Sequence, residues 1–158
     1  MKLRTEKKSA MIFGEGKQDS IFINDFLKEK SFNKQFPEWI FFSDHGSGGS
    51  PEDILKLCRR VISGKDYTAV VCLIDLDQLK KNYHKKDLWK RKKLELEQNY
   101  GGIFILWQEN NAQEETKREL GIKRDMTKRA VNRLSRSQIS KLINKGRCMR
   151  IANYFKCL

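Results

Sequence analysis

The sequence has few cysteines and prolines, and it lacks an uncharged run long enough to span a membrane. The chain has two prolines and four cysteines, with no Cys-x-x-Cys pair. This excludes the common zinc and redox motifs and favours free thiols in a reducing compartment. No segment reaches the roughly 18 uncharged residues that a transmembrane helix needs, and residues 1–8 contain no apolar signal-peptide core. We therefore predict a cytoplasmic protein without a membrane partner.

Low-complexity segments are also missing, and the composition is that of a folded chain. Apolar residues make up 39% of the sequence and charged residues 34%, which excludes an intrinsically disordered protein. A length of 158 residues corresponds to one globular unit that can bury a core without disulfides. Within it we predict an α/β core over residues 1–110 and a basic helical extension over residues 111–158 that packs on the core.

Acidic residues become scarce only in the second half of the chain. Residues 1–77 carry 12 Lys and Arg against 12 Asp and Glu, whereas residues 78–158 carry 21 against eight, so the whole net charge of +13 lies in the second half. Such a field attracts polyanions and speeds their encounter. We predict DNA or RNA as the partner; the alternative is an ordinary solvated surface.

Strand-like and helix-like segments alternate along the chain. Strand character appears at residues 9–13, 36–42, 68–74 and 102–107. Helical spacing appears at residues 19–30, 51–61, 78–100, 127–136 and 137–145, and again at the end of the chain, with a loop over residues 43–50. The alternation predicts a Rossmann-like three-layer α/β domain with a mostly parallel four-stranded central sheet, helices on both faces and a basic helical C-terminal extension.

Three acidic residues follow the predicted strands. Glu15 comes just after the first strand, and Asp75 and Asp77 come just after the third. The carboxyl ends of parallel strands share one edge of a sheet, and period-two spacing on an extended segment keeps residues 75 and 77 on one side. Carboxylates gathered there repel one another unless a divalent cation compensates, and Mg²⁺ or Mn²⁺ suits hard oxygen ligands. An Asp-x-Asp pair at a strand end is also compatible with a structural or solvated role.

Two segments resemble the TOPRIM superfamily. Residues 11–22 (MIFGEGKQDSIF) are similar to its first motif, an apolar strand followed by Glu-Gly and a helix-opening Asp, and residues 70–77 (VVCLIDLD) are similar to its Asp-x-Asp strand. The resemblance covers roughly residues 8–107. It implies that Glu15 is a general acid/base or metal ligand and that Asp75 and Asp77 are metal ligands. Asp19 matches the helix-opening acid, as a further ligand or as a helix cap.

The segment between the two motifs indicates a subgroup. Residues 46–53 (GSGGSPED) are similar to the corresponding loop and helix start of RloB-like and OLD-related proteins, which are linked to bacterial defence. Residues 106–110 (LWQEN) depart from the Trp-containing motif that RloB-like proteins carry after the fourth strand. Glu109 in this segment is either a peripheral carboxylate of the site or a solvated strand-end residue.

Several cations are candidates for contact with phosphate. Lys17 stands beside Glu15, where it contacts a phosphate or balances the acids. Near-helical spacing places a further group on one face of a helix, which binds phosphates or is simply solvated: Lys128, Arg129, Arg133 and Arg136. His45 and His84 lack a second ligand at metal-binding spacing, so neither is expected to be catalytic or to bind zinc.

Together these features predict a Mg²⁺-dependent nuclease that hydrolyses phosphodiesters of DNA or RNA, in defence of a bacterium or mobile element. The alternative is a non-catalytic TOPRIM subunit that binds nucleic acid within a larger assembly, with a protein partner such as an ATPase. A receiver domain needs an acidic pair after the first strand, and a haloacid-dehalogenase phosphatase needs its Asp-x-Asp there; the sequence has neither.

Overall fold

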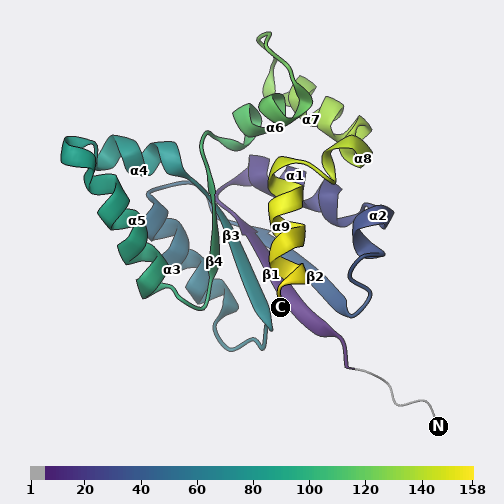
Figure 1. The fold of residues 1–158 in the computed structure, drawn as a ribbon, viewed down its shortest axis with the longest axis horizontal. Coiled ribbons are helices and arrows are strands. Elements are labelled where there is room, and N and C mark those ends of the chain that lie inside the picture. Colours follow the sequence, from purple (N-terminus) through teal and green to yellow (C-terminus); the bar gives the residue numbers. More distant parts are fainter. Residues whose placement is uncertain (1–5) are drawn as a thin grey trace.

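Four parallel strands form the central sheet of this computed structural model, which describes residues 6–158 (Figure 1). The spatial order is β2-β1-β3-β4, and the strands are β1 (Lys8–Gly14), β2 (Trp39–His45), β3 (Ala69–Asp75) and β4 (Phe104–Gln108). Because every neighbouring pair is parallel, all four carboxyl ends lie at one edge. The predicted α/β fold is confirmed, although residues 1–5 of the predicted core lie outside the described residues.

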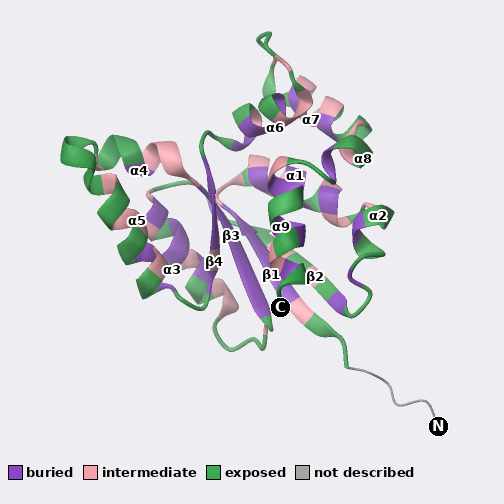
Figure 2. Cartoon of the chain, viewed as in Figure 1, coloured by how far each residue is buried: buried purple, intermediate pink, exposed green. Residues whose placement is uncertain are grey.

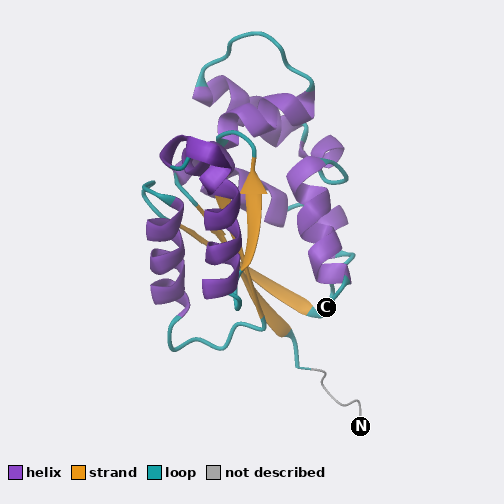
Figure 3. Ribbon diagram, turned by 60° about the vertical axis from the view of Figure 1, so that its left-hand side comes forward, coloured by secondary structure: helices purple, strands orange, loops and turns teal. Residues whose placement is uncertain are grey.

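Alternation along the strands sends side chains into two separate cores. In β1, Ala10 and Ile12 face one core, whereas Met11 and Phe13 face the other. The first core is covered by helices α1 (Lys17–Leu27), α2 (Lys30–Asn33) and α9 (Gly146–Lys156). The second is covered by α3 (Pro51–Ile62), α4 (Leu76–Asn82) and α5 (Leu88–Asn99). Figure 3 shows the sheet between these helical layers, and Figure 2 shows that β1 and β3 are largely buried.

The remaining helices gather beyond the carboxyl edge of the sheet (Figure 1). They are α6 (Ala112–Leu120), α7 (Lys128–Ser137) and the short α8 (Ile139–Leu142). Helix α7 lies against α1 and α6. The chain then returns along the sheet in α9, which buries Cys148, Ile151 and Phe155 in the first core. In the part of the chain that the structure describes, no helix is long and apolar enough to cross a membrane.

The start of α3 follows directly from its sequence. The Ser50 hydroxyl accepts a hydrogen bond from the Asp53 backbone N–H (3.2 Å), and the Asp53 carboxylate accepts one from the Ser50 N–H (3.4 Å). Pro51 occupies the first helical position, where the missing N–H has no cost. This reciprocal cap fixes where the loop after β2 ends.

Three predicted boundaries were wrong. Residues 36–38 precede β2 as a turn because the Phe36 ring is buried against Phe32 and Phe155, and β2 instead continues to His45. The predicted helix 137–145 is reduced to the four-residue α8. The extended segment expected through residue 77 ends at Asp75, because α4 begins at Leu76 and places Asp77 in its first turn. The period-two argument for Asp75 and Asp77 therefore does not hold.

Gly14 is the backbone position where β1 and α1 come closest. A Cβ added at residue 14 would lie 2.5 Å from the Asp19 Cβ. We expect Gly14→Ala to lower the free energy of unfolding by about 1 to 3 kcal/mol, as overpacking does. Gly102→Ala is the matched control, since nothing lies within 4 Å of its added Cβ. Urea unfolding of both variants tests this, and equal losses would contradict the close approach.

Candidate functional site

Glu15 and Asp75 meet at the carboxyl edge of the sheet. Glu15 follows β1 and Asp75 ends β3, and Glu15 Oε2 accepts a hydrogen bond of 2.8 Å from the Asp75 backbone N–H. Both residues are partly buried. The prediction that these two acids share one edge of the sheet is confirmed, because strands β1 and β3 are parallel neighbours.

Asp19 belongs to the same edge. It lies in the first turn of α1 and is 5% exposed, and its Oδ2 accepts a hydrogen bond from the Gly16 N–H (3.1 Å). Its other oxygen, Oδ1, accepts from the Gln108 side-chain amide (2.9 Å). Asp19 therefore caps its helix, as one of the two alternatives held, and it also lies within the cluster of acids.

Gln108, which sequence reasoning missed, joins Asp19 to Asp75. It is the last residue of β4 and lies beside Asp75 in the strand register, so both side chains project from the same face. Its Nε2 donates to Asp19 Oδ1 and to Asp75 Oδ1 (3.1 Å). Its place directly after the predicted strand 102–107 was the available signal. Glu109, which we considered instead, is exposed and pairs with Arg118.

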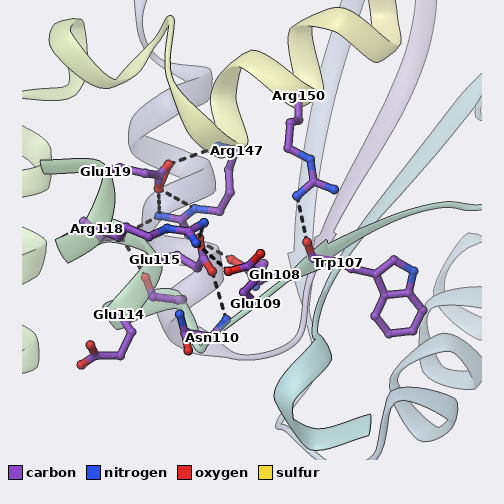
Figure 4. Close-up of polar contacts among 12 residues, drawn as sticks. Trp107, Gln108, Glu109, Asn110, Glu114, Glu115, Arg118, Glu119, Arg147 and Arg150 are labelled. Atoms are coloured by element: carbon purple, nitrogen blue, oxygen red, sulfur yellow. Dashed lines mark hydrogen bonds and ion pairs between the residues drawn. The ribbon is translucent and has the colours of Figure 1, made fainter. Parts of the chain in front are cut away.

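Arg147 fixes the orientation of this amide. Its guanidinium is buried and donates to Gln108 Oε1 (3.1 Å), to Thr116 Oγ1 (2.7 Å) and to Glu119 (2.8 Å), as Figure 4 shows in part. It also lies 3.7 Å from the centre of the Phe22 ring. Because Arg147 has no acceptor, it must face the amide oxygen, and the amide nitrogen then faces the acids. No sequence pattern indicated that this arginine is buried.

Burial raises the pKa of each of the three acids in the cleft, and the pKa values of Glu15 and Asp75 come close to neutral pH. Burial raises the pKa of Glu15 to about 7, and the charges of Asp19 and Asp77 add to this increase. Burial and the neighbouring Glu15 charge raise the pKa of Asp75 to about 8. Burial also raises the pKa of Asp19, against the hydrogen bonds from Gln108 and Gly16. Removing these groups from water disfavours their charged forms, so the site favours a compensating cation.

The acids open into a cleft of about 580 Å³. Glu15, Asp19 and Asp75 line it together with Lys17 and Lys128, whose side chains are exposed. The loop after β2 forms one wall and the start of α6 forms another. Carboxylates at the base and exposed lysines at the rim place opposite charges within one cavity.

The wall formed by the loop after β2 is fastened to the strand ends. The Gly46 N–H donates to the Gly14 carbonyl (3.0 Å), and the Gly48 N–H donates to the Glu15 carbonyl (3.1 Å). These two N–H groups are therefore used within the protein. His45 also lines the cleft, with its Nδ1 2.7 Å from the Gly46 carbonyl oxygen.

Other predicted site residues lie outside the cleft lining. Asp77 is partly buried in the first turn of α4 and acts on Glu15 and Asp75 through its charge. Arg129 and Arg133 are exposed on α7, and Arg136 forms an ion pair with Asp25 (3.2 Å). Among residues 6–158, no three His, Cys, Asp or Glu side chains are placed to hold one metal ion jointly. The carboxylates instead accept hydrogen bonds from amide groups of the protein.

Comparison with known proteins gives no family assignment. No protein-family model matches the chain, and no curated protein matches it significantly.

Arg147 has a measurable structural role. Arg147→Met leaves Glu119 buried without its partner, and we expect the free energy of unfolding to fall by about 3 to 5 kcal/mol. The double variant Arg147→Met/Glu119→Leu should lose less, because neither side chain then carries an unpaired buried charge. Urea unfolding measures both. A double variant less stable than Arg147→Met would contradict this role.

The raised pKa values make stability depend on pH. The folded chain holds protons on Glu15 and Asp75 more tightly than the unfolded chain, so this contribution to stability is lost as pH rises through about 7 to 8. We expect Glu15→Gln/Asp75→Asn to be more stable than wild type at about pH 8.5, by on the order of 1 kcal/mol after solvent screening, and to show little difference at about pH 5. An equal effect at both pH values, measured by urea unfolding without divalent ions, would contradict this.

Proposed function

We propose that the protein is a Mg²⁺- or Mn²⁺-dependent nuclease that cleaves phosphodiester bonds of DNA or RNA in the cleft. One observation carries the proposal: Glu15, Asp19 and Asp75 line the base of a cleft whose rim bears Lys17 and Lys128. The acids suit a hard cation and the lysines suit a phosphate. A metal ion and the phosphate it binds would therefore both find partners in one cavity. The resemblance to TOPRIM proteins supports the same reading.

The carboxylates of Glu15 and Asp75 have the chemistry that a divalent cation prefers, although a third acid of residues 6–158 would have to move to join them on one ion. Glu15 and Asp75 supply carboxylate oxygens, and their raised pKa values reflect the cost of charging them in place. Asp19 is the third candidate ligand, and Asp77 strengthens the negative field from the first turn of α4. When bound, Mg²⁺ polarises a phosphoryl group and lowers the pKa of a coordinated water.

The residues of the chain have separate roles in this proposal. Glu15, with a pKa of about 7, is suited to accept or donate a proton near neutral pH. Asp75 holds its position through the Gln108 amide, which Arg147 orients from the opposite side. Lys17 and Lys128 bind the phosphate of the substrate. The α7 cations Arg129, Arg133 and Arg136 would contact the phosphate backbone away from the cleft, with Arg136 first released from Asp25.

A second candidate is a non-catalytic subunit that binds nucleic acid. It is favoured by the engagement of Asp19 and Asp75 with the Gln108 amide, since among the described residues no three acids converge on one point. In this case the acids stabilise the strand ends and the basic surface binds nucleic acid. A larger assembly, with an ATPase as one partner, then supplies the chemistry.

The setting we propose is the cytoplasm of a bacterium or a mobile element's host, in defence. Four cysteines are present as free thiols, and three of them are buried, as suits a reducing compartment. A cation-rich surface there meets DNA and RNA as its most abundant polyanions.

Cleavage of labelled DNA and RNA with Mg²⁺ or Mn²⁺ tests the nuclease. We expect Glu15→Gln and Asp75→Asn each to lower the cleavage rate by about 100-fold or more, as loss of a proton-transfer or ligand group does. Asp77→Asn should cost less, because Asp77 lies outside the cleft lining.

The matched controls are Glu38→Gln and Asp66→Asn, which replace exposed carboxylates before β2 and β3, at the opposite edge of the sheet. Both should retain the wild-type rate. Binding of nucleic acid without any metal-dependent cleavage would contradict the nuclease and support the binding subunit. Equal losses in the controls and in the cleft variants would contradict the assignment of the site.

A further inference from the structure

Helices α4 and α5 and the short 3-10 helix η1 between them (Lys85–Asp87) form a second basic surface, which we call the α4–α5 arm (residues 76–99). Residues 80–93 (KKNYHKKDLWKRKK) contain eight Lys and Arg and one acid. Most of these cations are exposed. The arm therefore concentrates positive charge in a segment distinct from α7, to which the contacts with phosphate were first assigned.

Several of these cations have no acidic partner. Lys90 pairs with Asp87, Lys92 with Glu52 and Glu95, and Lys93 with Glu97. The others have no acid within ion-pair distance in residues 6–158, and they are Lys80, Lys81, Lys85, Lys86 and Arg91. A row of uncompensated cations repels itself, and an external polyanion relieves that repulsion.

The aromatic residues of the arm are partly buried, and lysine side chains lie over their rings. Lys80 lies 4.9 Å and Lys90 lies 5.6 Å from the centre of the Trp89 ring, and Lys92 lies 5.8 Å from the centre of the Tyr83 ring. Trp89 and Tyr83 also pack against the second core. Proteins that bind single strands offer open aromatic faces to the bases. The arm instead presents cations, which suit the phosphate backbone of a duplex.

The continuous apolar side of the arm packs on the second core. Leu79 of α4 and Leu96 of α5 are each 1% exposed in the second core, whereas Leu88 and Leu94 of α5 are 42% and 58% exposed. The two exposed leucines are six positions apart, which places them about 120° apart around the helix axis, so they do not form one continuous apolar face. A helix that binds at a membrane surface needs a free apolar face to insert below the headgroups. Because the sheet already covers that face, nucleic acid is favoured over an anionic membrane.

The position of the arm links it to the cleft. Helix α4 begins at Leu76, one residue after Asp75, so the arm starts from the strand end that carries the site. The arm packs on the second core, whereas α7 packs on α1 from the first-core side, and Figure 1 shows α4 and α7 on opposite sides of the strand ends. The arm and α7 therefore lie on opposite sides of the strand ends that carry the cleft.

We propose that the α4–α5 arm binds the phosphate backbone of double-stranded nucleic acid that also reaches the α7 side of the cleft. The choice of ligand rests on the proposed function, and the inference adds the substrate class and a second binding surface. A duplex satisfies both basic surfaces at once, because its phosphates run along both sides of any segment placed over the cleft. Affinity should then depend on salt through contacts on the arm.

The test compares two triple variants by fluorescence anisotropy, with a labelled duplex of about 20 base pairs, two helical turns, in EDTA. Lys81→Ala/Lys85→Ala/Arg91→Ala removes three exposed cations of the arm. Lys34→Ala/Lys65→Ala/Lys156→Ala removes three exposed cations that lie after α2, before β3 and at the end of α9. Both variants lose the same net charge, so a difference between them reports position.

We expect the arm variant to bind the duplex about tenfold or more weakly than wild type at moderate salt. The plot of log affinity against log salt should become less steep by about 2 to 3, since each lost contact with a B-DNA phosphate removes about 0.9 from the magnitude of its slope. The control variant should stay close to wild type. Equal effects of the two variants, or tighter binding of a single strand of the same length by wild type, would overturn the proposal. So would undiminished duplex binding by the arm variant.

The outcome is separable from that of the nuclease. Binding is measured without divalent metal, and Asp66→Asn, which replaces an exposed carboxylate before β3 at the opposite edge of the sheet, should bind the duplex as wild type does. Duplex binding that depends on the arm, without cleavage in the presence of Mg²⁺, would support the proposal for the arm and contradict the nuclease. If cleavage and duplex binding are both unchanged in the arm variant, the proposal for the arm is contradicted and the nuclease is supported.

Discussion

One carboxamide connects two carboxylates at the carboxyl edge of the sheet. The Gln108 Nε2 donates to Asp19 and Asp75, and its Oε1 accepts from Arg147. An amide can serve two acids only when its oxygen is satisfied elsewhere, so the orientation of the whole cluster depends on the guanidinium behind it. These residues come from β3, β4, α1 and α9, so the orientation of the acids depends on segments from both ends of the chain.

Burial gives this arrangement its chemical character. Arg147 is 1% exposed, and its charge is matched by Glu119 and by neutral acceptors. Such a group is costly to bury unless every donor finds a partner, and here it also orients the amide that holds Asp19 and Asp75. Glu15 and Asp75 are also partly buried, and this burial raises their pKa values toward neutral pH. Lysines at the rim of the cleft and on the two flanking basic surfaces then supply the opposite charge.

Patterns along the chain predicted the parts of the structure that depend on local periodicity. Apolar runs indicated all four strands, and parallel order brought Glu15 and Asp75 to one edge, as expected. The position of Asp77 could not be predicted from the sequence, because the change from strand to helix occurs at Leu76 without a glycine or proline to mark it. The burial of Arg147 could not be predicted for another reason. An arginine near the start of a basic helix is expected to be solvated, and only the tertiary packing shows that Phe22 and Glu119 enclose it. The basic segment 78–100 was correctly expected to be helical, yet its place beside the cleft required the fold.

The central claim is that Glu15 and Asp75 form one site whose charge a divalent cation compensates. The most direct measurement is a ¹³C NMR titration of their side-chain carboxyl carbons, with and without Mg²⁺. Without metal, the account predicts a pKa of about 7 for Glu15 and about 8 for Asp75, and saturating Mg²⁺ should lower both. If both carboxyls titrate near their ordinary values, or if Mg²⁺ leaves both titration curves unchanged, the account of this site is wrong.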